Sequence, residues 1–146
     1  MTDKDMWKLF MSEENLQDTT YEAWAFGGDP DGLAQLAFDG IKTGTASAYP
    51  LYEIENEPFP EAGSYSVILN SRDEAVCIIQ TTKVYVVPFN QVSEEHACKE
   101  GEGDRSLSYW RKVHEDFFST YMLEAGITFD ENMLVVCEEF NVVYLG

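Results

Sequence analysis

The sequence predicts a single α+β domain built on a small, curled or barrel-like sheet with flanking helices. Two kinds of segment indicate this class: stretches rich in β-branched residues, and stretches whose apolar residues recur at helical spacing. The chain has 146 residues, enough for one domain with a core but too few for two of typical size. No repeat, low-complexity tract or linker marks a boundary, so we interpret residues 1–146 as one domain.

Helical spacing of apolar residues predicts three main helices. The first covers residues 3–14, with Thr2 or Asp3 as its N-terminal cap. The second covers residues 30–40 and ends at a glycine, a common residue after the last helical turn. The third and longest covers residues 107–126. Its expected apolar face consists of Leu107, Trp110, His114, Phe117, Phe118 and Tyr121.

Strands are predicted where β-branched residues are dense. Residues 64–70 and 74–89 read as two strands joined by a hairpin-type turn, and residues 133–146 read as a closing strand. A further strand is expected to start at Lys42. The segment 49–63 contains three prolines and several acids, so we expect a long loop there.

Charge narrows the possible partners. The chain has 9 Lys and Arg against 27 Asp and Glu, a formal net charge of −18. Nucleic-acid affinity comes largely from basic residues that neutralise phosphates, so this balance argues against a duplex-DNA binder. A small uncharged ligand, a short nucleotide met by a local basic group, or a basic protein partner all remain compatible with it.

Other bulk features point to a cytoplasmic protein. No apolar run approaches the roughly 18 residues needed to span a membrane, and no secretion leader is recognisable, so no membrane partner is expected. Of three cysteines, Cys77 and Cys137 lie in apolar runs, where cysteine behaves as a small hydrophobe. Nothing indicates a cofactor. The sequence leaves the oligomeric state open.

The segment 40–47, "GIKTGTAS", contains the most notable polar residues. Side chains three apart on a flat strand point to opposite faces, so Lys42 and Thr45 converge only if the chain bends between them. Gly44 lies between the two and supplies that freedom. The alternative interpretation is a solvated lysine at a strand entrance followed by ordinary strand-forming threonines.

Aromatic residues flank this segment. Trp24, Phe26, Tyr49 and Tyr52 are candidates for stacking on a nucleobase, because every base offers a π-face. The alternative is that they belong to the core. Tyr49 and Tyr52 are the more interesting pair because they fall in the proline-rich segment that we expect to be exposed.

Metal-binding interpretations are weaker. Within residues 91–106, a short helix should precede an acidic, glycine-rich loop. The acids of this loop are oxygen ligands but lack the spacing of a calcium loop. His96, Cys98 and His114 offer zinc ligands in principle, but no Cys-x-x-Cys pair occurs. We therefore predict no metal site, and we interpret His114 as a core histidine.

Four sequence elements stand out along the chain: "GIKTGTAS", "GSYSVIL", "VPFNQVSEEHACKEGEGDRSLSYWRKVHEDFF" and "VVCEEFNVVY". Through them the chain resembles the ASCH domain family over residues 24–144. The elements "EGEGDRSLSYW" and "HEDFF" are similar to one bacterial branch. This resemblance implies a PUA-like fold, a small β-barrel with helices and a cleft that holds a G-x-K-x-x-T element. Residues 1–23 then form an N-terminal helical extension.

The resemblance also implies a function and an active site. Such domains are generally associated with RNA, and one branch hydrolyses the amide of N4-acetylcytidine. Lys42, Thr45 and Glu100 stand at the positions of that branch's active site, with Thr45 implied as nucleophile, Lys42 as its activating base and Glu100 as a proton relay. Because Glu102 lies near Glu100 and acids favour a charged ammonium, we interpret Lys42 instead as an electrostatic clamp and Glu100 as the better base.

One position departs from the family. Ser47 replaces an arginine that many members carry, which removes a bidentate phosphate contact. Arg105 is a candidate to compensate, although it can also pair with the neighbouring acids. We expect Thr43, Ser47, Arg105 and Glu102 to contribute to ligand binding together with Trp24, Tyr49 and Tyr52.

Two functions follow as hypotheses. The first is an amidohydrolase of acylated cytidine or a related modified nucleoside, which the acidic charge and Ser47 favour. The second is a non-catalytic module that binds a short RNA or a nucleotide in the same cleft. A ribonuclease is a third possibility, but the sequence identifies no histidine pair that would flank a phosphate.

Overall fold

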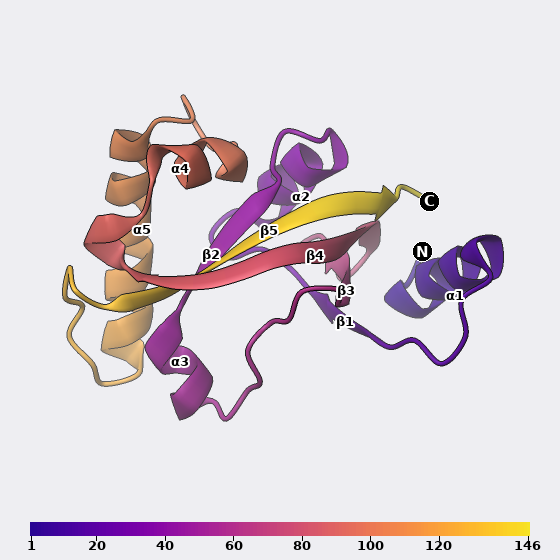
Figure 1. Cartoon of the computed structure of the whole chain (residues 1–146), viewed down its shortest axis with the longest axis horizontal. Coiled ribbons are helices and arrows are strands. Elements are labelled where there is room, and N and C mark those ends of the chain that lie inside the picture. The colour runs from indigo at the N-terminus through magenta and orange to yellow at the C-terminus, as the bar shows by residue number, and fades with distance from the viewer.

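The computed structural model describes residues 1–146 and shows an α+β fold (Figure 1). One mixed sheet contains five strands in the order β1-β3-β4-β5-β2. The strands are Tyr21–Trp24 (β1), Gly44–Ala48 (β2), Tyr65–Leu69 (β3), Ala75–Pro88 (β4) and Leu134–Tyr144 (β5). β1 pairs with β3 in parallel, and every other pair is antiparallel.

Five helices surround this sheet. They are Asp3–Glu14 (α1), Pro30–Phe38 (α2), Tyr49–Ile54 (α3), Glu94–Glu100 (α4) and Leu107–Glu124 (α5), with a short 3-10 turn at Phe89–Gln91. Figure 1 shows α4 and α5 at one end of the long β4–β5 pair, and α1 at the other end beside both chain termini. None of these helices combines the length and the apolar composition that crossing a membrane would require.

The predicted caps and turns explain where the main elements begin. Thr2 caps α1 in a reciprocal capping box with Asp5, which satisfies two backbone donors at the helix start. The turn after β3 is organised by Asn70, whose side-chain oxygen accepts from the backbone of Arg72 and Glu74. β4 and β5 shift register twice along their length, and such bulges bend a sheet. The predicted curled sheet is therefore confirmed.

The core consists of three apolar clusters, which are covered by α1, α2 and α5. α1 places Met6, Trp7 and Phe10 against the β3–β4 hairpin. α2 packs Ala34 and Ala37 over a second cluster that contains Phe26 and Phe140. α5 covers the third cluster with Trp110, Phe118 and Met122. On α5 the burial differs from the predicted face at one edge, because Tyr121 is exposed and Met122 is buried in its place.

Two local predictions were wrong. The segment 49–63 is not one long loop, because α3 occupies its first six residues. Pro50 lies in the first turn of α3, where a missing N–H costs nothing. The strand expected to start at Lys42 begins at Gly44, so Lys42 belongs to the turn that follows α2. β1 was not anticipated as a strand: it has only four residues at the sheet edge.

Candidate functional site

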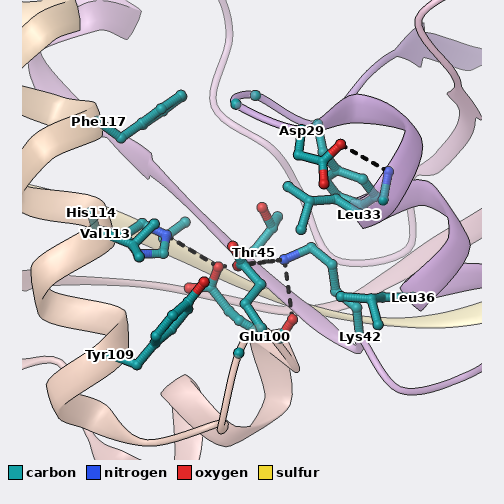
Figure 2. Close-up of a pocket in the computed structure, with 17 residues that line it drawn as sticks. Asp29, Leu33, Leu36, Lys42, Thr45, Glu100, Tyr109, Val113, His114 and Phe117 are labelled. Carbon is teal, nitrogen blue, oxygen red and sulfur yellow. Dashed lines mark hydrogen bonds and ion pairs between the residues drawn. The ribbon is translucent and has the colours of Figure 1, made fainter.

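A cavity of about 470 Å³ opens between the start of α2, the acidic loop after α4 and one face of α5. Lys42, Thr45, Glu100 and Glu102 line it together with apolar and aromatic side chains (Figure 2). The structure thus brings four of the predicted site residues to one concave surface. They come from the turn before β2, from β2 itself, from the end of α4 and from the loop that follows.

The backbone fixes Lys42 from both sides. The amides of Ile41 and Lys42 both donate to the carbonyl of Leu36, at 2.9 and 3.1 Å, which closes α2. The amide of Thr43 donates to the carbonyl of Lys99 at 2.6 Å, which anchors the following residue to α4. Lys42 therefore enters the site from a rigid turn, and its side chain is only 1% exposed.

The Lys42 ammonium lies between two carboxylates. Its Nζ is 3.5 Å from Glu100 Oε1 and 3.3 Å from Glu102 Oε2, and it also approaches the Glu100 carbonyl at 3.4 Å. The ring of Phe26 lies 5.0 Å away, within cation–π range. These contacts favour the charged ammonium, so we interpret Lys42 as a fixed positive charge in a buried place.

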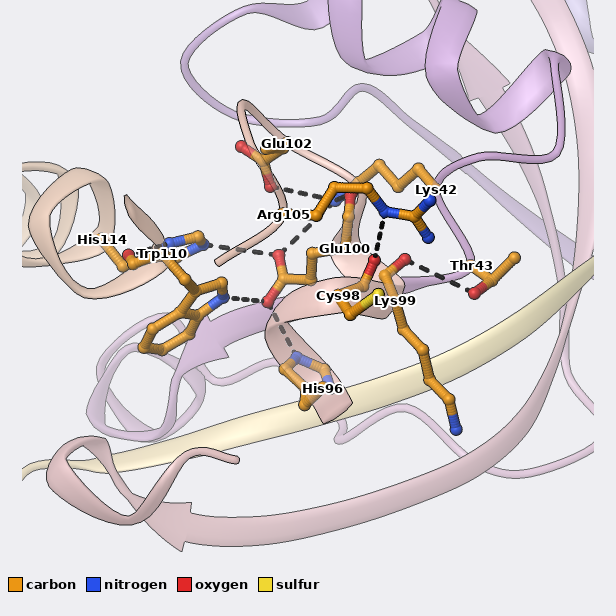
Figure 3. Close-up of polar contacts among 10 residues, drawn as sticks. All are labelled: Lys42, Thr43, His96, Cys98, Lys99, Glu100, Glu102, Arg105, Trp110 and His114. Carbon is orange, nitrogen blue, oxygen red and sulfur yellow. Dashed lines mark hydrogen bonds and ion pairs between the residues drawn. The ribbon is translucent and has the colours of Figure 1, made fainter. Parts of the chain in front are cut away.

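Glu100 is the most heavily bonded side chain of the site (Figure 3). Its carboxylate contacts Trp110 Nε1, His96 Nε2 at 2.8 Å, His114 Nε2 at 3.4 Å and the Lys42 ammonium. Burial alone would raise the pKa of the Glu100 carboxyl, but the Lys42 charge and the bonds from His114 and His96 hold that pKa well below its usual range. Glu100 is therefore a poor proton acceptor, contrary to our interpretation of it as the base.

His114 completes this cluster from α5. Its Nδ1 is 2.8 Å from the Trp110 carbonyl oxygen and its ring stacks on the Trp110 indole at 4.1 Å. Burial acts to lower the pKa of His114, but the hydrogen bond and the charge of Glu100 raise that pKa above its usual value. His114 is thus a buried, partnered histidine at the cavity wall rather than a purely apolar contact.

Thr45 reaches the cavity from β2. Lys42 and Thr45 face the same cavity because Lys42 lies in the turn, where strand alternation does not apply. Gly44 makes the close approach of β2 possible: a Cβ there would lie 3.2 Å from the Glu138 carbonyl oxygen and 3.4 Å from the side chain of Lys99. Gly44 therefore serves close packing, whereas the sequence suggested it as a point of backbone freedom; its φ is not in the left-handed region.

Comparison with known proteins identifies the family. The ASCH domain profile matches residues 22–144. The chain belongs to the ASCH domain family. This ASCH domain is similar to a crystal structure of an ASCH domain from Lactobacillus crispatus JV V101, with 35% identity, a TM-score of 0.86, and coverage of 96% of this chain and 95% of that one. The predicted resemblance is therefore confirmed.

Two further solved structures share the fold. A protein from Enterococcus faecalis V583 is 36% identical with a TM-score of 0.90, covering 97% of this chain and 88% of that one. A hypothetical protein at 14% identity and a TM-score of 0.56 covers 84% of this chain and 98% of the other, a likeness of fold alone. No curated protein matches the chain. ASCH domains have a PUA-like fold that often binds RNA.

The other predicted ligand-binding residues lie away from the cavity of this ASCH domain. Three of these side chains form hydrogen bonds: Thr43 Oγ1 donates to Lys99 O, Arg105 Nε donates to Cys98 O, and Ser47 Oγ lies 2.7 Å from Tyr52 Oη. The aromatic ones pack on other rings: Tyr49 and Tyr52 on Phe59, and Trp24 on Phe26. We therefore draw the ligand site around the cavity-lining residues alone.

Of the aromatic residues that line the cavity, the sequence suggested only Phe26 as a ligand-stacking residue. Phe26, Tyr109 and Phe117 form part of its wall. Tyr109, Val113 and Phe117 are four residues apart on α5, next to its buried stripe, so helical spacing was an available signal. Phe117 packs so closely on Gly27 that a Cβ at Gly27 would collide with its ring.

A metal-like grouping exists within the site. Ligand atoms of Glu100, Glu102 and His114 lie within 4.8 Å of one another. However, the Lys42 ammonium already contacts Glu100 Oε1 and Glu102 Oε2, so a cation here would compete with a resident positive charge. The structure therefore gives no support for routing the chemistry through a metal.

Glu138 is a further residue that sequence reasoning missed. It lies on β5, directly opposite Thr45 in the β2–β5 register, and is 8% exposed. Burial, reinforced by the charge of Glu22, raises the pKa of the Glu138 carboxyl to about 7. The signal was the pair of glutamates inside an apolar strand, because alternation sends one of them to each face of the sheet.

Proposed function

We propose that this ASCH domain is an amidohydrolase that removes the acyl group from the exocyclic nitrogen of an acylated cytidine or a related modified nucleoside. The observation that carries the proposal is that Lys42, whose ammonium is buried, and Thr45, which has a hydroxyl, line the same cavity. Its volume of about 470 Å³ falls within the range that small-molecule sites occupy, roughly 300–1,000 Å³. A single nucleoside is a ligand of suitable size.

Charge supports an uncharged ligand over a polyphosphate or a long RNA. Lys42 is already matched by two carboxylates, Glu100 and Glu102, so the cavity has no excess positive charge to offer a phosphate. The chain as a whole has a formal net charge of −18. This negative charge repels phosphate groups but does not repel an uncharged nucleoside.

The residues present support a covalent route. In this scheme Thr45 Oγ1 attacks the acyl carbon, and Lys42 stabilises the negative charge that develops on the carbonyl oxygen. Glu100 acts as a positioning residue: with Glu102 it holds the ammonium in place, and its own oxygens are occupied by donors. A fixed charge in a buried place acts strongly on a developing oxyanion because little solvent rearrangement is needed.

Aromatic walls offer a way to orient the base. Phe26, Tyr109 and Phe117 line the cavity and present ring surfaces on which a pyrimidine can stack. Tyr109 also has a hydroxyl that can hydrogen-bond. These residues, in place of Trp24, Tyr49 and Tyr52, are our proposed base-binding group.

Hydrolysis of N4-acetylcytidine by purified protein tests the proposal, with cytidine release followed by chromatography. Thr45→Val removes only the hydroxyl and is expected to lower kcat by at least about 100-fold. Thr82→Val is the matched control, since Thr82 is an exposed threonine on β4 whose hydroxyl bonds to Glu139 O. Absence of turnover by the folded wild type, or equal activity of Thr45→Val and wild type, would contradict the proposal.

The second candidate is a binding module without chemistry. It is favoured by the aromatic wall, which suits stacking of a base, and by the frequent association of the family with RNA. No turnover combined with nucleotide binding that Lys42→Ala abolishes would support this alternative. Lys83→Ala is its control, because the Lys83 side chain is 63% exposed and lies outside the cavity.

A further inference from the structure

Glu138 and Thr45 are neighbours across the β2–β5 ladder. Directly opposite residues of an antiparallel pair share a face of the sheet, and their Cβ atoms lie about 4.5–5.5 Å apart. Thr45 lines the cavity, whereas Glu138 lies behind it, outside the lining, on the side of Glu22 and Tyr52. Glu139, the next residue, points to the other face and binds Lys99 at 2.8 Å.

The Glu138 carboxylate has no partner in the protein. It takes part in none of the hydrogen bonds or ion pairs of the structure, although the residue is only 8% exposed. Glu22 from β1 and Tyr52 from α3 are the ionisable side chains nearest in effect, and Val84 lies opposite on β4. The Tyr52 hydroxyl is engaged with Ser47 at 2.7 Å. The fully buried side-chain polar atoms without a partner are His96 Nδ1 and Arg111 Nε, so the Glu138 oxygens remain within reach of water and free to accept a proton.

The charged and titratable groups that line the cavity already have partners. His114 contacts Glu100 and the Trp110 carbonyl, and Asp29 accepts from the Gly32 amide. Lys42 lies between two carboxylates that favour its charged form, and a charged ammonium accepts no proton. Glu100 is occupied by donors, and Glu102 is paired with Lys42. Glu138 alone is both adjacent to Thr45 and unpartnered.

We propose that Glu138 is the general base that takes the proton of Thr45, either directly or through one bridging water. The inference rests on the proposed amidohydrolase function and adds a catalytic residue to it. A base should have a pKa close to the working pH, and burial beside Glu22 raises the pKa of Glu138 to about 7.

The proposed hydrolysis has two steps, acyl transfer to Thr45 and hydrolysis of the resulting ester. Thr45 Oγ1 bonds to the acyl carbon while its proton passes to Glu138, and the carbonyl oxygen becomes an anion facing Lys42. The tetrahedral intermediate then collapses, the C–N bond breaks, and the proton on Glu138 goes to the departing exocyclic nitrogen. This leaves free cytidine and an acyl ester on Thr45. Water attacks the ester, gives a proton to Glu138, and the proton returns to Thr45 Oγ1 as the carboxylic acid leaves.

The test compares Glu138→Gln with Glu139→Gln as a matched control on the same strand. Rates of N4-acetylcytidine hydrolysis are measured between pH 5 and pH 9, and urea unfolding confirms that each variant folds. We expect Glu138→Gln to lower kcat by roughly 100- to 10,000-fold with little change in KM, and to abolish the rise of kcat through neutral pH. We expect Glu139→Gln to retain both the rate and the pH profile.

Glu22→Gln adds a readout that a structural role for Glu138 would not move. It removes the like charge beside Glu138, so the rise of kcat should shift to lower pH. An active wild type with an unchanged Glu138→Gln variant would overturn the assignment of Glu138 alone. A folded wild type that does not hydrolyse the substrate would overturn the proposed function and this inference together.

Discussion

Glu100 and Glu138 are two buried carboxylates of one small protein, and their environments shift their pKa values in opposite directions. Their exposed fractions are 1% and 8%. The pKa of Glu100 is held well below its usual range, whereas the pKa of Glu138 is raised to about 7. Burial therefore does not decide the charge state of a carboxylate by itself.

The difference lies in the donors. Glu100 receives contacts from an ammonium, an indole N–H and two histidines, which replace the lost water. Glu138 faces Glu22, another acid, and no donor. The comparison separates two functions: Glu100 stabilises a cationic site, and Glu138 remains available for proton transfer. Pairs of carboxylates whose environments separate their pKa values mark acid–base assignments in many active sites.

The largest expected effect comes from removing the charge of Glu100. Glu100→Gln presents an amide to donors that need an acceptor and leaves Lys42 with Glu102 alone. Breaking a buried ion pair in this way costs about 3–5 kcal/mol of unfolding free energy. Urea unfolding at pH 7 measures it. Glu102→Gln should cost clearly less, because the Glu102 side chain is 16% exposed; equal losses would contradict the account.

Glu138→Gln should stabilise the protein at high pH, whereas Glu100→Gln destabilises it. Glu138 binds its proton more tightly in the folded state, so the wild type loses stability as pH rises from about 4.5 to about 7. The variant lacks this loss, and the pH-dependent part of the difference should reach roughly 3 kcal/mol by pH 8. Unfolding at pH 5 and pH 8 measures it. Parallel curves for the two proteins would show that Glu138 is not unpartnered in solution.

Trp110→Phe should weaken the Glu100 cluster by a smaller amount. The indole N–H donates to Glu100 Oε2, and a hydrogen bond to a charged group contributes about 1.5–3 kcal/mol. Because Glu100 has a lowered pKa, this contribution is present above pH 4.5 and lost as pH falls further. Trp7→Phe in the α1 cluster is the control, since it removes similar ring area away from the Glu100 carboxylate. The prediction would be contradicted if Trp110→Phe and Trp7→Phe lost stability with the same pH dependence.

The smallest effect is expected from Glu22→Gln. Glu22 is exposed and acts on Glu138 only through its charge, so the gain in stability above pH 7 should stay below about 1 kcal/mol. The same substitution should lower the pKa of Glu138. High salt should reproduce part of this change in the wild type, because exposed charges are screened. An unaltered Glu138 titration would mean that burial alone sets its pKa.

Much of the fold could be predicted from local patterns. Thr2 as the cap of α1, the turn after β3 and the long helix α5 all follow from short-range rules. α3 was missed because prolines and acids suggested a loop, whereas a proline in the first turn is compatible with a helix. β1 was missed because four residues at a sheet edge give too little alternation to recognise.

The candidate site was only partly predictable. Lys42, Thr45 and Glu100 were placed through the family resemblance, since residue types alone favoured a solvated lysine at a strand entrance. The packing of Tyr49 and Tyr52 on Phe59 depends on how α3 folds back, which no local rule provides. The face of Glu138 follows from strand alternation, but its lack of donors depends on segments far away in the sequence.

The most direct test of the central claim is a titration of the glutamate side-chain carboxyl carbons by NMR, with Glu100→Gln and Glu138→Gln used for assignment. The account predicts that Glu138 titrates at a pH of about 7, while Glu100 stays ionised until the solution is well below pH 4.5. Ordinary acidic titration of Glu138, or protonation of Glu100 near neutral pH, would contradict it.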